Sequence, residues 1–205
     1  MVNKTRERLL DVARQLFARK GIENTTMNDI AAASDNGRRT VYTYFKNKTD
    51  IFNALVRQEA NIIIDRLKEV AATDLPPEEK LMRFIFVRFE AVKEVVGRNG
   101  TLKAAFFNDI KRVERVRRAN HVHETAILEQ ILAEGVAQGL FAIKHAHPTA
   151  SVMLLSLEGL DIHYIRDNFA DLGIERSMLR TYIKDFILHG ISSRPTQQQN
   201  KFIHQ

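Results

Sequence analysis

The chain has 205 residues, a formal net charge of +6 and no cysteine. The missing cysteine excludes a disulfide framework, a cysteine nucleophile and thiolate metal sites, while the length and the 44% hydrophobic composition permit a buried core in one or two domains. The first ten residues form no apolar signal segment and no stretch approaches the roughly 18 apolar residues of a membrane span, so we expect a cytoplasmic protein without membrane contact.

The first predicted helix covers Lys4 to Lys20. Leu9, Ala13 and Phe17 recur on one face of it, and Gly21 follows at the position where helices commonly end. The first 50 residues contain ten Lys/Arg and six Asp/Glu, so +4 of the net charge of +6 lies in this quarter of the chain. By itself this excess is typical of a solvated surface, but beside the motif that follows it indicates attraction for a polyanion.

The stretch Thr26 to Lys48 predicts two short helices around a tight turn. Thr26 and Asp29 have the spacing of a capping box at the start of the first helix. The turn formers Asp35-Asn36-Gly37 follow, and we expect Gly37 to take the positive φ that other residues resist. The next seven-residue helix places an apolar face (Val41, Tyr44, Phe45) opposite a polar one (Arg38, Arg39, Tyr42, Thr43, Lys46). Cations and hydroxyls on the outer face of a short, braced helix suit the major groove of DNA.

The segments TTMNDIA, ASDNG and RRTVYTYFKNK together resemble the helix-turn-helix of tetracycline-repressor-like (TetR family) transcriptional regulators. The resemblance covers about Arg6 to Leu55, and its most specific part is Thr40 to Lys48. Two features depart from the family pattern. The usual Ala-Gly-Val-Ser turn is Ser34-Asp35-Asn36-Gly37, and the usual small residue before Thr40 is Arg39. The resemblance therefore implies DNA binding without indicating which bases are read.

Base reading is assigned to Arg38 and Arg39, because a guanidinium pairs bidentately with guanine. The resemblance implies that Thr40, Tyr42 and Lys48 contact phosphates, with Thr26 helping. The complete predicted DNA-binding set is Thr26, Arg38, Arg39, Thr40, Tyr42, Thr43, Tyr44, Lys46 and Lys48.

The rest of the chain predicts further helices and no strand. They cover Asp50–Ala72, Glu78–Arg98 with Pro77 in its first position, a short apolar segment Leu102–Ile110, then Val113–Gln138, Thr149–Asn168 and Ser177–Ile191. The predicted fold is all-α with about nine helices. We expect a helix-turn-helix domain at 1–47, a helical regulatory and dimerisation domain at 48–192, and a loose polar tail at 193–205.

The last two predicted helices are candidates for a dimer interface. The helix Thr149–Asn168 has hardly any polar face and must be buried on most sides, and Ser177–Ile191 carries a regular apolar stripe. The alternative is that both merely close the core of the monomer. The predicted interface residues are Val152, Leu155, Gly159, Ile162, Leu179, Ile183, Phe186 and Ile187.

A phenylalanine-rich region precedes these helices. The family resemblance implies a cavity for a small, often hydrophobic effector, and its predicted lining is Phe84, Phe86, Phe89, Phe106, Phe107 and Ile131. The alternative is that these side chains only fill the core. Glu114 and Glu124 lie among arginines and are interpreted as part of a salt-bridged helix surface.

Catalytic and cofactor motifs are missing from the sequence. It contains no P-loop, dinucleotide fingerprint or G-x-S-x-G, so we expect no enzyme and no cofactor. His121 and His123 are two residues apart and diverge on a helix, and His145 and His147 lack an evident third ligand, so no metal site is predicted.

Two functions from different classes remain. One is a ligand-responsive dimeric repressor that binds a pseudo-palindromic operator and is released by a small molecule. The other is a constitutive or architectural DNA-binding protein whose C-terminal part only dimerises. The first is favoured, because the chain beyond the DNA-binding segment is larger than two dimer helices require.

Overall fold

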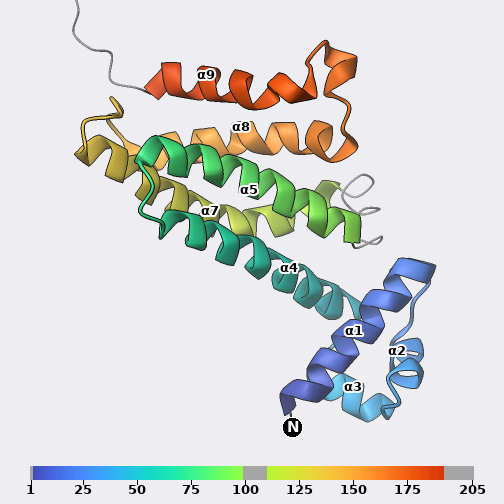
Figure 1. Ribbon diagram of the computed structural model, residues 1–205. Coiled ribbons are helices and arrows are strands. Elements are labelled where there is room, and N and C mark those ends of the chain that lie inside the picture. Colours follow the sequence, from blue (N-terminus) through green and yellow to red (C-terminus); the bar gives the residue numbers. More distant parts are fainter. Residues whose placement is uncertain (1, 99–109, 192–205) are drawn as a thin grey trace, which may run out of the picture. The chain divides into compact units, whose positions relative to one another are not determined.

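The computed structural model describes residues 2–98 and 110–191, with side chains described for 4–97 and 120–191. Over these residues the chain is built of α-helices and two short 3-10 helices, which confirms the all-α prediction (Figure 1). Two predicted features lie outside the described residues: most of the apolar segment that begins at Leu102, and the tail 193–205.

The observed helices agree closely with the predicted ones. They are α1 Val2–Lys20, α2 Met27–Ala33, α3 Arg38–Tyr44, α4 Lys48–Ala71, α5 Pro77–Arg98, α7 Ile110–Ala137, α8 Ala146–Arg166 and α9 Leu179–Ile191. Pro77 is the first residue of α5, as predicted. Helix α9 begins later than predicted, because Arg176–Met178 forms a 3-10 turn before it.

The contacts divide the chain into two compact units. The first contains the described residues of Met1–Asp65 and Glu90–Val122, and the second contains Arg66–Phe89 and the described chain from His123 onward. Helix α4 continues from the first unit into the second. The functional division predicted at residues 47 and 192 stays a prediction.

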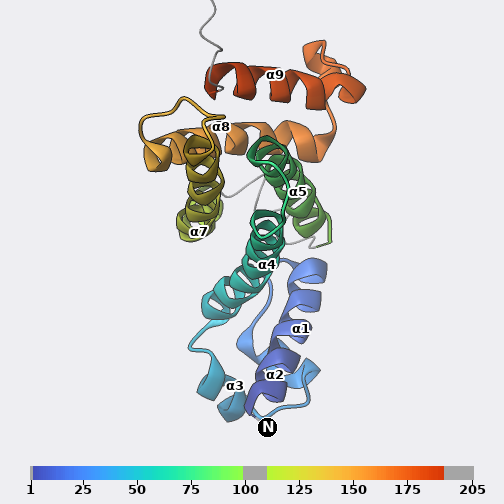
Figure 2. The same ribbon diagram turned by 60° about the vertical axis from the view of Figure 1, so that its left-hand side comes forward.

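Helices α1, α2, α3 and the first half of α4 belong to the first unit (Figure 2). Their buried side chains form one apolar core. Phe17 from α1 meets Phe52 from α4 edge to face, with ring centroids 6.5 Å apart. Val41 from α3 and Ile30 from α2 are fully buried in the same cluster. Core contacts therefore fix the inner face of α3 and turn its other face outward.

A buried cluster of charges joins α5, α7 and α8 in the second unit. The Nε of Arg88 donates to Glu124 at 2.7 Å, and its two terminal nitrogens donate to the oxygens of Asp161 at 2.7 and 3.1 Å. Each of the three side chains is at most 7% exposed. Glu124 is salt-bridged as interpreted, but its place on a helix surface is wrong, because α7 turns it inward onto Arg88. The side chain of Glu114 lies outside the described residues.

The end of α7 depends on a close approach. A Cβ at Gly135 would lie 2.1 Å from the ring of Phe141, so this ring packs directly on the bare backbone of the helix. Phe141 is only 3% exposed there. Gly139, with φ of +72°, takes the left-handed conformation that lets the chain fold back after the helix.

Candidate nucleic-acid interface

Helix α2 is positioned by the capping box expected from the sequence. The Oγ1 of Thr26 accepts from the backbone N–H of Asp29 at 3.1 Å, and the carboxylate of Asp29 accepts from the backbone N–H of Thr26 at 2.9 Å. These hydrogen bonds, first of all the one from the Thr26 backbone, hold the pKa of Asp29 below its usual value. The hydroxyl of Thr26 also donates to Asp29, so a phosphate at this point would compete for that proton.

The turn between α2 and α3 differs from the prediction. Gly37 has φ of −63°, an ordinary value, and the left-handed residue is Asp35, with φ of +55°. The expectation of a positive φ at Gly37 is therefore wrong. The chain reverses immediately after Ser34, and the N–H of Asn36 then donates to the carbonyl of Ala31 at 3.0 Å. Aspartate tolerates the left-handed region better than most residues, which allows the reversal at this point.

Helix α3 presents a polar face to solvent. Val41 is fully buried in the core, while Arg38, Arg39 and Tyr42 are exposed on the other side. The guanidinium of Arg38 lies 5.5 Å from the ring centroid of Tyr42, and the hydroxyl of Thr43 donates to the carbonyl of Arg39 at 3.0 Å. This exposed face is the surface that the sequence predicts for base reading.

The nine predicted DNA-binding residues differ in exposure. Exposed are Thr26, Arg38, Arg39, Tyr42, Thr43 and Lys46, and half-buried are Thr40, Tyr44 and Lys48. Tyr44 packs against the apolar core.

Lys48 is engaged within the first unit. Its Nζ donates to the carbonyls of Ile22 and Glu23 at 2.8 and 2.9 Å and lies 3.8 Å from the carboxylate of Glu23. The first residue of α4 thus holds the turn that follows α1. The predicted contact of Lys48 with a phosphate stays a prediction. The observed hydrogen bonds show that Lys48 also has a structural role.

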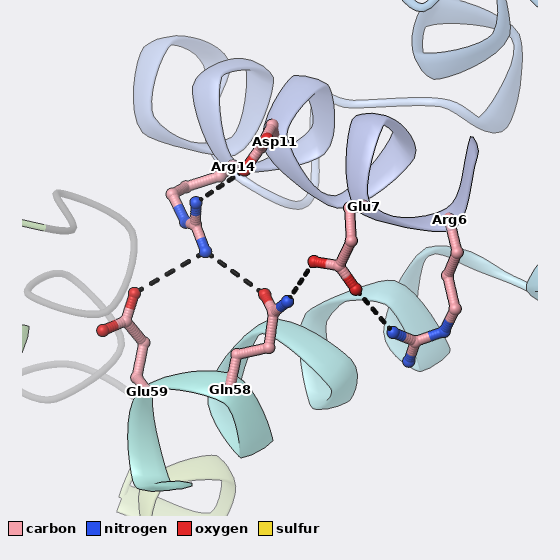
Figure 3. A network of polar contacts seen from close by, with 6 residues as sticks. All are labelled: Arg6, Glu7, Asp11, Arg14, Gln58 and Glu59. Carbon is pink, nitrogen blue, oxygen red and sulfur yellow. Dashed lines mark hydrogen bonds and ion pairs between the residues drawn. The ribbon is translucent and has the colours of Figure 1, made fainter. Parts of the chain in front are cut away.

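The sequence interpretation missed a polar network between α1 and α4, drawn in Figure 3. Arg14 donates to the side-chain oxygen of Gln58 at 3.3 Å and lies 3.7 Å from the carboxylate of Glu59. The amide nitrogen of Gln58 donates in turn to Glu7 at 2.5 Å. These partners are 44 to 51 residues apart, so periodicity within either helix carries no sign of them.

Comparison with known proteins agrees with this arrangement. The model of the family "Bacterial regulatory proteins, tetR family" matches residues 9–55. The HTH-type transcriptional repressor KstR2 of Mycolicibacterium smegmatis (strain ATCC 700084 / mc(2)155) is 30% identical over 142 residues, which cover 66% of this chain and 67% of that protein. The chain belongs to the TetR family.

Two further comparisons, one with a sequence relative and one with a solved structure, agree with this finding. The probable acrEF/envCD operon repressor of Escherichia coli (strain K12) is 30% identical over 146 residues, which cover 68% of this chain and just under two thirds, 66%, of that protein. The solved structure of the SmeT–triclosan complex covers 98% of both chains with a TM-score of 0.66 and 18% identity, and shows the same fold. Within the described residues, no helix is long and apolar enough to cross a membrane.

The predicted dimer residues of this TetR-family chain fall into two groups. Val152, Leu155, Gly159, Ile162 and Phe186 are exposed, whereas Leu179, Ile183 and Ile187 are buried on the inner face of α9. An apolar groove of about 840 Å³ runs between α8 and α9, and members of both groups line it. Whether a second subunit covers this surface stays a prediction.

The predicted effector residues lie in the second unit as far as the structure describes them. Phe84, Phe89 and Ile131 are at most 1% exposed, and Phe86 is half-buried. Phe89 stacks on Tyr164 with ring centroids 4.7 Å apart. Phe106 and Phe107 lie outside the described residues, and the lining of a cavity by this set stays a prediction.

Proposed function

We propose that this protein is a dimeric, non-enzymatic transcriptional repressor that binds a pseudo-palindromic operator through α3 and is released by a small hydrophobic effector. The observation that carries the proposal is the exposed face of α3, where Arg38, Arg39 and Tyr42 stand opposite a buried Val41. The names of the relatives support it, since both sequence relatives are described as repressors.

Arg38 and Arg39 have the assigned role of reading bases, because an exposed guanidinium can reach O6 and N7 of guanine in the major groove. Thr40, Tyr42 and Lys48, with Lys46 beside them, contact phosphates and hold the helix in register without distinguishing sequences. The basic excess of the first 50 residues, +4, steers the protein toward the duplex.

Dimerisation through α8 and α9 supplies the second recognition helix. Phe186 is 80% exposed, Val152 is 65% exposed and Leu155 is 57% exposed, an apolar surface that a soluble protein normally covers. A two-fold pairing of this face would bring two copies of α3 to half-sites about one helical turn or slightly more apart.

Release by a small molecule rests on the continuous helix α4 and on the aromatic core of the second unit. SmeT is described in complex with triclosan, which supports a hydrophobic effector for a protein of this fold. A ligand shifts the DNA-binding equilibrium only by its difference in affinity between the competent and incompetent states. Coupling of about 1–3 kcal/mol would release DNA roughly 5- to 150-fold.

The test begins with selection of duplexes from a random-sequence pool by the wild-type protein, followed by titration of the selected palindrome. Arg39→Ala should weaken this binding by about 1–3 kcal/mol and alter base preference, while the matched variant Lys46→Ala should weaken specific and random duplexes alike. Equal loss on both kinds of duplex for Arg39→Ala would refute the assigned roles.

The effector is tested by a thermal-shift screen of small hydrophobic compounds, with DNA titration in the presence of each hit. Hits that lower operator affinity support the repressor with an effector. Hits that stabilise the protein and leave DNA affinity unchanged favour the constitutive alternative instead.

A further inference from the structure

We propose that Gln58 is a positioning residue for DNA binding, which fixes α1 and the attached helix-turn-helix at one angle to α4 and thereby sets the half-site spacing that the protein accepts. The proposal rests on the proposed function, because spacing matters only to a dimer with two recognition helices. It concerns a residue outside the DNA-binding surface.

Both polar atoms of the Gln58 amide form hydrogen bonds with α1. Its oxygen accepts from Arg14 at 3.3 Å and its nitrogen donates to Glu7 at 2.5 Å, and these two partners lie two turns apart on α1 (Figure 3). One side chain of α4 thus contacts two separate points of α1. Apolar packing between the helices is non-directional, whereas hydrogen bonds weaken steeply when their angle changes. The network therefore selects one crossing geometry among those that the core would allow.

Neighbouring contacts further restrain the angle between α1 and α4. Glu7 lies 3.4 Å from Arg6, whose guanidinium is 5.4 Å from the ring centroid of Phe45, the C-cap residue that follows α3. At the first residue of α4, Lys48 binds the turn that follows α1. Ten residues of helix, about 15 Å, separate Lys48 from Gln58. Polar contacts at both Lys48 and Gln58 fix the angle between α1 and α4. A contact at one of these points alone would leave that angle free.

The angle matters because of the geometry of the operator. Each added base pair moves one half-site about 3.4 Å along the duplex and turns it by roughly a tenth of a revolution. A helix-turn-helix held at one angle meets both half-sites at a single spacing. One that pivots on α4 tolerates neighbouring spacings and loses discrimination between them.

The experiment uses the full-length protein and palindromic duplexes selected by the wild type, with the spacer lengthened or shortened by one base pair. Gln58→Met keeps the length of the side chain and removes both hydrogen bonds. It should lower the affinity ratio between the best and the shifted spacers by about fivefold, the equilibrium weight of about one hydrogen bond. Binding to a duplex with a single half-site should stay unchanged, which a general loss of structure would not produce.

Asn61→Leu is the matched control, since it removes an exposed amide one turn further along α4, and it should keep the wild-type ratio. Glu7→Ala, at an exposed position of α1, should loosen discrimination in the same direction even if Gln58→Met folds poorly. The exchange of Glu7→Gln together with Gln58→Glu reverses this hydrogen bond, with the donor now on α1 and the acceptor on α4, keeps an acceptor for Arg14, and should restore the ratio.

An unchanged spacing profile in both Gln58→Met and Glu7→Ala would overturn the proposal, as would failure of the exchange to restore it. Failure of the proposed function would look different, because the wild type itself would then select no palindrome.

Discussion

Two phenylalanines at opposite ends of the chain show how differently its apolar helices are covered. Phe17 on α1 is 1% exposed, enclosed by α1 to α4 of its own unit, whereas Phe186 on α9 is 80% exposed beside the groove between α8 and α9. Both lie in amphipathic helices with a regular apolar stripe. The stripe identifies a helix and its apolar side chains, but the partner that covers them is decided by the rest of the molecule.

The largest expected effect comes from removing the enclosed ring. Phe17→Ala should lower the free energy of unfolding by about 3–5 kcal/mol, because it leaves a cavity in a core that cannot collapse around it. Phe186→Ala is the matched control. It should leave the stability of the isolated monomer within about 0.5 kcal/mol and instead weaken dimerisation by about 2 kcal/mol, as expected for an aromatic residue at the centre of an interface.

Urea unfolding at low protein concentration measures the first quantity, and sedimentation equilibrium measures the second. A wild-type protein that stays monomeric at micromolar concentration would refute the dimer. Equal destabilisation of the monomer by both substitutions would contradict the contrast between an enclosed Phe17 and an exposed Phe186.

Prediction from the sequence succeeded where the determining signals are local. The capping box of Thr26 and Asp29, the polar face of α3 and the position of Pro77 at the start of α5 all follow from residues a few positions apart. The same local patterns located nearly every helix, because apolar periodicity and caps act within one or two turns.

Prediction failed where the partner is distant in sequence. Arg88 lies 36 residues from Glu124 and 73 from Asp161, and charged residues are most often solvated, so the buried cluster was not expected. One signal was available. Asp161 lies on a helix that is apolar nearly all round, beside Leu157 and Tyr164, and an acid on such a face requires a buried cation.

The second prediction concerns this cluster, which holds the inner face of α8, opposite the exposed apolar side chains. Asp161→Asn should lower the free energy of unfolding by about 3 kcal/mol, because it leaves the buried Arg88 without its bidentate carboxylate. Glu124→Gln is the matched control. It should cost less, because Arg88 keeps both of its hydrogen bonds to Asp161 and loses only the single one to Glu124. Urea titrations at pH 7 compare the two variants.

The pH dependence of protein stability tests the role of Glu124. Burial raises the pKa of Glu124, against the opposing effect of Arg88, so the folded protein binds a proton there more readily than the unfolded chain does. Stability from this group is therefore present below the unfolded pKa of a glutamate and is lost as the pH rises through the higher folded value. Relative to Glu124→Gln, the wild type should gain stability as the pH is lowered from 7 toward 4.5. A difference between the two proteins that does not change with pH would contradict this.

The smallest expected effect lies in the turn between α2 and α3, where Asp35 is exposed. Asp35 takes a left-handed conformation, with φ of +55°, at the position where the usual Ala-Gly-Val-Ser turn of TetR-family regulators has glycine. Glycine adopts this conformation without the steric conflict of a Cβ, although it loses more freedom on folding. Asp35→Gly should therefore raise the free energy of unfolding by only about 0.5 kcal/mol, while Asp35→Ala should lower it by about 1 kcal/mol. The comparison of glycine with alanine tests the backbone itself, because both remove the carboxylate. Equal unfolding midpoints for the two variants would mean that the left-handed turn is not under strain, and that aspartate replaces glycine there at no cost to the helix-turn-helix.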